Sequence, residues 1–152
     1  TCRTLLATAD QGRVLREGSR VALLSYGGRL GECLMAAQRL ESQGVGTSVM
    51  DARFAKPLDE ALIRQCARHH EAIITVEEGS MGGFGAYVLQ FMAGAGLLDK
   101  GLVVRSLTLP DRFQDHDTPE QQYADAGLNA AEIAQQTLEA LGIAARPEAL
   151  DD

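Results

Sequence analysis

Glycine-rich and charged segments follow four predicted strands of this chain, and their residue types are suited to binding anions or other surfaces. The first is Ser25–Gly28, a tight turn from a strand into a helix. It lacks the GxGxxG pattern of dinucleotide sites and the lysine of a P-loop, so it is a weak nucleotide signature. The second holds Asp51, Arg53 and Lys56, which could hold an anion or form an ion pair across their own loop. We favour the ion pair, because such loops usually satisfy their own charges.

The third segment is VEEGSMGGFG, which leads from a strand into a helix. Glu77 and Glu78 are adjacent on the strand, so their side chains leave opposite faces and cannot flank one bond as an acid/base pair. Glycines allow a backbone to approach another surface closely, and amides at a helix start can bind an anion. Packing against another chain and anion binding both remain open for this loop, whose candidate residues are Gly79, Ser80, Gly82, Gly83, Phe84 and Gly85.

The fourth segment, LPDRFQDHD, places His116 between two aspartates. A metal site needs three or four convergent ligands, whereas the other histidines, His69 and His70, end a different predicted helix. We therefore predict no metal site and interpret His116, taken alone, as an exposed loop residue. Neither the serines of these loops nor the cysteines have a base at a predictable spacing. The residues alone predict an α/β domain without a self-sufficient active site.

Alternation of short apolar runs with helical periods predicts how these loops are positioned. Strands over 13–16 and 20–25 are separated by a short turn, so we expect them to pair antiparallel with each other. Further strands ending near Asp51, at AIITVEE and at LVVRSLTLP alternate with helices, which favours parallel pairing with right-handed crossovers. Asp59, Thr118 and Asn129 are typical helix caps. The predicted fold is a three-layer α/β/α domain whose five-stranded, mostly parallel sheet has one antiparallel strand.

Composition limits the partners and the compartment. The chain has 152 residues, 45% of them hydrophobic and 23% charged, and a net charge of −7 without any basic cluster. This excludes a phosphate-backbone partner, and no apolar run is long enough to span a bilayer. Cys2, Cys33 and Cys66 are odd in number and widely spaced, which favours a reducing, cytoplasmic location. Because the chain begins with Thr1, we expect a piece of a longer protein or a processed product.

Several segments, taken together and in order, resemble the C-terminal domain of the transketolase family, and most closely that of the 1-deoxy-D-xylulose-5-phosphate synthases. They run from Gly12 to Leu141, so we expect a lead-in or linker over 1–11, the domain over 12–142 and a frayed tail over 143–152. The segments that carry the resemblance are GRVLREGSRVALLSYGGRLGECLMAA, DARFAKPLD, HEAIITVEEGSMGGFGAYVLQF, LPDRF with DHD, and YADAGLNAAEI.

The resemblance implies a parent enzyme that uses thiamine diphosphate and Mg²⁺ to condense pyruvate with glyceraldehyde 3-phosphate. It also implies that the cofactor is not bound by this chain, since the family's Gly-Asp-Gly segment does not occur in it. The expected partners are the cofactor- and pyrimidine-binding domains of the same enzyme, in a homodimer. We expect the GGFG loop to lie at an interface, with Phe84 as its apolar anchor, and Asp111 and His116 to lie at the edge of the active site. The alternatives are the same domain of a transketolase or of a 2-oxoacid dehydrogenase beta-subunit, or a free-standing anion- or nucleotide-binding regulator.

Overall fold

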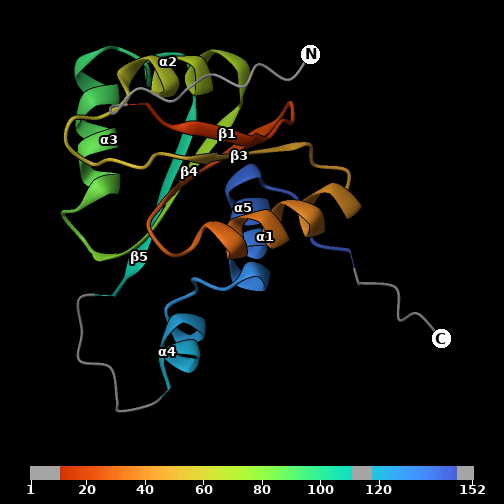
Figure 1. Cartoon of the computed structure of the whole chain (residues 1–152). Coiled ribbons are helices and arrows are strands. Elements are labelled where there is room, and N and C mark those ends of the chain that lie inside the picture. Colours follow the sequence, from red (N-terminus) through yellow and green to blue (C-terminus); the bar gives the residue numbers. More distant parts are fainter. Residues whose placement is uncertain (1–10, 111–117, 147–152) are drawn as a thin grey trace.

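A computed structural model describes residues 11–110 and 118–146 of the chain. The elements alternate along the sequence much as the apolar periods predict (Figure 1). In chain order they are β1 (Arg13–Arg16), β2 (Val21–Tyr26), α1 (Leu30–Ser42), β3 (Thr47–Asp51), α2 (Glu60–His69), β4 (Ala72–Ser80), α3 (Phe84–Gly94), β5 (Val103–Leu109), α4 (Pro119–Asp125) and α5 (Ala130–Leu141).

The strands form one sheet in the order β1-β3-β2-β4-β5. Strands β2 to β5 are parallel to one another, and β1 is antiparallel to β3, so the predicted fold class is confirmed. Helices α1 and α5 cover one face of the sheet and α2 and α3 the other (Figure 1). None of the helices in the described part of the chain is long and apolar enough to cross a bilayer.

The two apolar cores lie on opposite faces of the sheet and share its central strands. In β2, Val21 and Leu23 pack with α1 and α5, whereas Ala22 and Leu24 pack with α2 and α3. This alternation follows from the two-residue period of a strand. Both faces of β2 are therefore apolar, and the strand has the continuous hydrophobic sequence typical of the centre of a parallel sheet.

The predicted pairing of the first two strands with each other is wrong. Strand β1 pairs with β3, with Arg13 opposite Asp51, while β2 lies between β3 and β4. Both edges of β2 are thus occupied by strands that are largely buried. The four residues of β1 are mostly exposed and bury little apolar surface, so this strand is left at the edge of the sheet.

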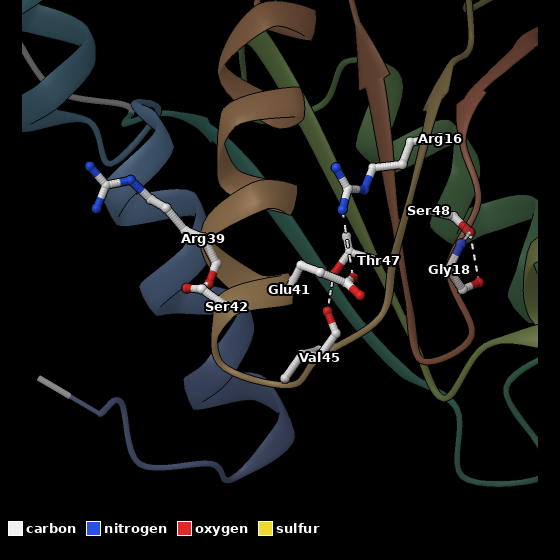
Figure 2. Close-up of polar contacts among 8 residues, drawn as sticks. All are labelled: Arg16, Gly18, Arg39, Glu41, Ser42, Val45, Thr47 and Ser48. Atoms are coloured by element: carbon white, nitrogen blue, oxygen red, sulfur yellow. Dashed lines mark hydrogen bonds and ion pairs between the residues drawn. The ribbon is translucent and has the colours of Figure 1, made fainter. Parts of the chain in front are cut away.

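The turn after β1 crosses the start of β3 through a close contact at Gly18 (Figure 2). The Gly18 N–H donates to Ser48 Oγ at 2.9 Å, and the same hydroxyl donates to the Gly18 carbonyl at 2.9 Å. A Cβ atom at residue 18 would lie 2.2 Å from the Thr47 nitrogen. Only glycine fits here, and its presence allows the chain to pass β3 before it enters β2.

All three predicted helix caps are confirmed. The side chains of Asp59, Thr118 and Asn129 accept hydrogen bonds from the backbone of the first turns of α2, α4 and α5. The lead-in over 1–11 lies outside the described residues except for Gln11. Of the predicted tail, residues 143–146 are described, and Arg146 exchanges two hydrogen bonds between its backbone and the Gln43 side chain.

Candidate functional site

The carboxyl ends of β2 and β4 meet at the centre of the sheet, where the chain changes direction across it. After β2 the chain crosses to β3 on one side, and after β3 it returns to β4 on the other side of β2. Ligand and partner sites of open parallel sheets gather at such a point. The two loops that lie here are the turn after Tyr26 and the glycine-rich loop after Glu77, and these two residues are register partners.

The glycine-rich loop is built around the buried carboxylate of Glu77, a residue that is only 2% exposed. This carboxylate accepts hydrogen bonds from the N–H groups of Phe84, at 3.0 Å, and Gly85, both in the first turn of α3. Cβ atoms at Gly79 and Gly83 would lie 2.8 and 2.3 Å from Glu77 Oε1. The amides that could have bound an external anion are thus paired with the chain's own carboxylate, which also stabilises the positive end of the helix.

Glu78 lies on the opposite face of β4, as predicted, and joins different elements. Its Oε1 is 3.2 Å from Arg29 Nε at the start of α1. The Arg29 guanidinium carbon in turn lies 3.9 Å from the centre of the Tyr123 ring on α4. Glu77 therefore holds the start of α3, whereas Glu78 links α1 and α4 through Arg29. Because the two carboxylates lie on opposite faces of β4, they do not share an acid/base role.

Phe84 is not the exposed anchor that the sequence predicts. It is 2% exposed and stacks on Tyr26, with ring centres 5.0 Å apart. Its position directly after the loop turns the ring inward, toward the core shared by α2 and α3. The exposed apolar residue is Met81, which is 73% exposed at the tip of the same loop. Sequence analysis missed it, although an apolar side chain between four glycines, outside any helical or strand period, is a usable signal.

The loop after β3 also differs from its prediction. Within the part of the chain that the structure covers, Asp51 pairs with Arg13 at 2.7 Å and with neither Arg53 nor Lys56. Arg13 is the cross-strand neighbour of Asp51 in the sheet and is therefore closer than the residues further along the loop. The Arg53 N–H donates to Asp51 Oδ1 at 3.1 Å, while Lys56 Nζ lies 4.5 Å from the centre of the Tyr87 ring.

The family model described as "Transketolase, C-terminal domain" matches residues 10–133 of this chain. The chain belongs to the transketolase C-terminal domain family. Among solved structures, it is similar to one described as a split-gene transketolase, an inactive beta4 tetramer, with 28% sequence identity and a TM-score of 0.79. The similarity covers 90% of this chain but 44% of that one, so this chain spans less than half the length of the solved relative.

The described residues of this transketolase C-terminal domain do not fit a thiamine diphosphate or metal site. In residues 11–110 and 118–146, no group of three or more His, Cys, Asp or Glu side chains is placed to hold a metal ion. The amides at the start of α3, the best phosphate donors of the glycine-rich loop, are bound to Glu77. No step of thiamine chemistry is therefore assigned to these residues.

The remaining candidates of the domain fall into two groups. Asp111 and His116 lie outside the described residues. Ser25, Cys33 and Cys66 are fully buried, and both of these cysteines are free thiols. Desolvation by burial raises the pKa of each thiol to about 12. Both thiols therefore stay protonated near neutral pH and pack as small apolar groups.

Proposed function

We propose that this chain is the C-terminal docking domain of a thiamine-diphosphate-dependent enzyme of transketolase type, and that the parent is a 1-deoxy-D-xylulose-5-phosphate synthase. Such a parent condenses pyruvate with D-glyceraldehyde 3-phosphate and releases CO₂. The domain's part is to present a rigid loop to the cofactor- and pyrimidine-binding domains in a homodimer, while the cofactor and Mg²⁺ are held by those other domains.

The single observation that carries the docking role is the exposed Met81 on a loop of fixed shape. Met81 is 73% exposed, and the loop beneath it is held by the two hydrogen bonds to Glu77. A rigid loop with an exposed apolar tip loses little conformational entropy when it enters a pocket of a partner. Methionine also fits irregular apolar pockets well.

Two features support opposite choices for the parent. The amino-acid sequences of the segments DARFAKPLD and LPDRF with DHD favour the deoxyxylulose phosphate synthase. The 28% identity to a split-gene transketolase favours a transketolase as the second candidate. The regulator hypothesis has less support, because Glu77 occupies amides that an anion would need and Glu78 adds a second carboxylate at this edge. A cytoplasmic location is in keeping with the two free, buried thiols.

The parent is tested by assaying the enzyme that contains this chain with two substrate pairs. We expect CO₂ release from pyruvate in the presence of glyceraldehyde 3-phosphate, dependent on thiamine diphosphate. Transfer of a two-carbon unit between sugar phosphates, without any pyruvate consumption, would establish the transketolase instead. Absence of both activities would overturn both assignments.

The docking role is tested by Met81→Glu in that enzyme. A charge at the loop tip would have to be desolvated in an apolar pocket, so we expect at least about tenfold weaker assembly. Sedimentation velocity measures the assembled fraction. Met35→Glu is the matched control, because Met35 is also exposed (46%) but lies on α1. Unchanged assembly of the Met81 variant, or equal loss in both variants, would reject the role of the loop.

A further inference from the structure

An open groove of about 670 Å³ lies on the face of the sheet covered by α2 and α3, and the glycine-rich loop after Glu77 is not part of its lining. Its walls are the loop from Ala55 to Leu58, one side of α2 and one side of α3. The volume is in the range of small-molecule sites. Gly94 and Ala95 also line the groove, and because both residues are small they take up little of its volume.

The α3 wall of the groove is aromatic. Tyr87 and Phe91 are four residues apart, so both rings lie on the same face of the helix. Both are only partly buried by the rest of the chain. Helix α3 has no charged residue from Phe84 to Gly94, and Gln90 supplies a polar side chain beside the two rings. This wall offers flat apolar surface together with a hydrogen-bonding amide.

A positively charged side chain lies over each of these two rings. Lys56 Nζ lies 4.5 Å from the centre of the Tyr87 ring, and the Arg64 guanidinium carbon lies 5.2 Å from that of Phe91. Over residues 11–110 and 118–146, neither cation has a carboxylate within ion-pair distance, whereas Arg13, Arg16, Arg20 and Arg29 each have one. Glu60 is the one acidic residue of the lining. In a chain with a net charge of −7, this groove therefore carries an excess of positive charge.

We propose that this groove binds a small phosphate ester with a planar, apolar body. The planar body lies on Tyr87 and Phe91, and the phosphate is held by Lys56 and Arg64. Arg64 can donate two hydrogen bonds to a phosphate, and Lys56 acts as a point charge. The groove binds such a ligand through residues that the docking role does not use, so this inference does not rest on the proposed function.

The test is a titration of this chain with 1-naphthyl phosphate, followed by amide chemical shifts in two-dimensional NMR. We expect saturable shifts confined to residues 55–64 and 87–95. Lys56→Gln and Arg64→Gln should each weaken binding several-fold, and the double variant about tenfold, as expected for partly exposed charge pairs. Arg68→Gln is the matched control, because Arg68 lies one helical turn beyond Arg64 on α2 but does not line the groove.

Two further probes separate the parts of the ligand. Neutral 1-naphthol and inorganic phosphate should each bind much more weakly than the ester, because each offers only half of the proposed contacts. The inference is overturned if the ester causes no saturable shifts, if the shifts map elsewhere, or if the control variant weakens binding as much as Arg64→Gln. Equal binding of 1-naphthol and the ester would likewise reject a phosphate site. None of these outcomes depends on the activity or assembly of the parent enzyme.

Discussion

At the scale of single residues, Glu77 is the side chain on which the glycine-rich loop depends. Its buried carboxylate accepts hydrogen bonds from two backbone N–H groups of α3. In Glu77→Gln one acceptor oxygen is replaced by an NH₂ group, which leaves a buried amide without a partner. We expect the free energy of unfolding to fall by about 1–3 kcal/mol, measured by urea denaturation.

The neighbouring glutamate supplies the control for this prediction. Glu78 is 38% exposed in its side chain and pairs with Arg29 near the surface. Exposed ion pairs contribute little, so Glu78→Gln should change the free energy of unfolding by less than about 1 kcal/mol. Equal effects of the two substitutions would contradict the role given to Glu77.

The buried thiols give a prediction about pH. Burial raises the pKa of Cys33 and Cys66 to about 12 in the folded chain, whereas an exposed thiol has a pKa of about 8.5. The unfolded chain therefore loses these protons first as the pH rises, so the thiols' contribution to stability is complete below about pH 8.5 and declines from there toward pH 12.

Thiol reactivity tests the burial on which this pH dependence rests. In a Cys2→Ser background, so that two cysteines remain, we expect almost no reaction with Ellman's reagent in the folded chain at pH 8. Both thiols should react in 8 M urea, where the chain is unfolded. Rapid reaction of either thiol under native conditions would mean that its thiolate is accessible, contrary to its burial.

At the scale of elements, the position of β1 depends on the contact between Gly18 and the start of β3. A Cβ atom at this residue would lie 2.2 Å from the Thr47 nitrogen and 2.5 Å from its carbonyl carbon. Because these are backbone atoms, they cannot move aside as a side chain can. We expect Gly18→Ala to lower the free energy of unfolding by roughly 2 kcal/mol or more, measured by chemical denaturation.

Gly31 is the matched control for Gly18. It lies in α1, where a Cβ would meet no atom within 4 Å apart from those of its chain neighbours and of the helix's own backbone. Alanine favours the helix over glycine, so Gly31→Ala should stabilise the chain by up to about 1 kcal/mol. If Gly18→Ala proved as harmless as Gly31→Ala, β1 would not need the close crossing described above.

Also at this scale, the periods and caps were sufficient to predict the helices and strands but not every pairing. The helix starts at Asp59, Thr118 and Asn129 can be predicted from the local sequence, because each capping side chain contacts the backbone only three residues further on. The partner of β1 depends on competition between edges of the whole sheet, which a local turn does not reveal. The inward ring of Phe84 and the capping by Glu77, seven residues before it, likewise depend on the path of the loop in space.

At the scale of the whole molecule, stability is concentrated in the middle of the sheet. Strands β2 and β4 have neighbours on both sides and are mostly buried, whereas β1 lies at an edge and is mostly exposed. We expect the amides of β2 and β4 to exchange with deuterium about 100-fold or more slowly than those of β1. Hydrogen-exchange mass spectrometry tests this, and equal protection of β1 and β2 would contradict it.

The enclosure of Glu77 by its own loop separates two properties that usually change together in a binding loop. The path of the backbone depends on Glu77 and on Gly79 and Gly83, both of which lie close to its carboxylate beneath the loop. The side chain that the loop presents to a partner is that of Met81 at its tip. Partner choice can therefore diverge between descendants of one ancestral domain through the outward residue alone. For protein engineering, randomising residue 81 would sample many surfaces on one preserved loop shape.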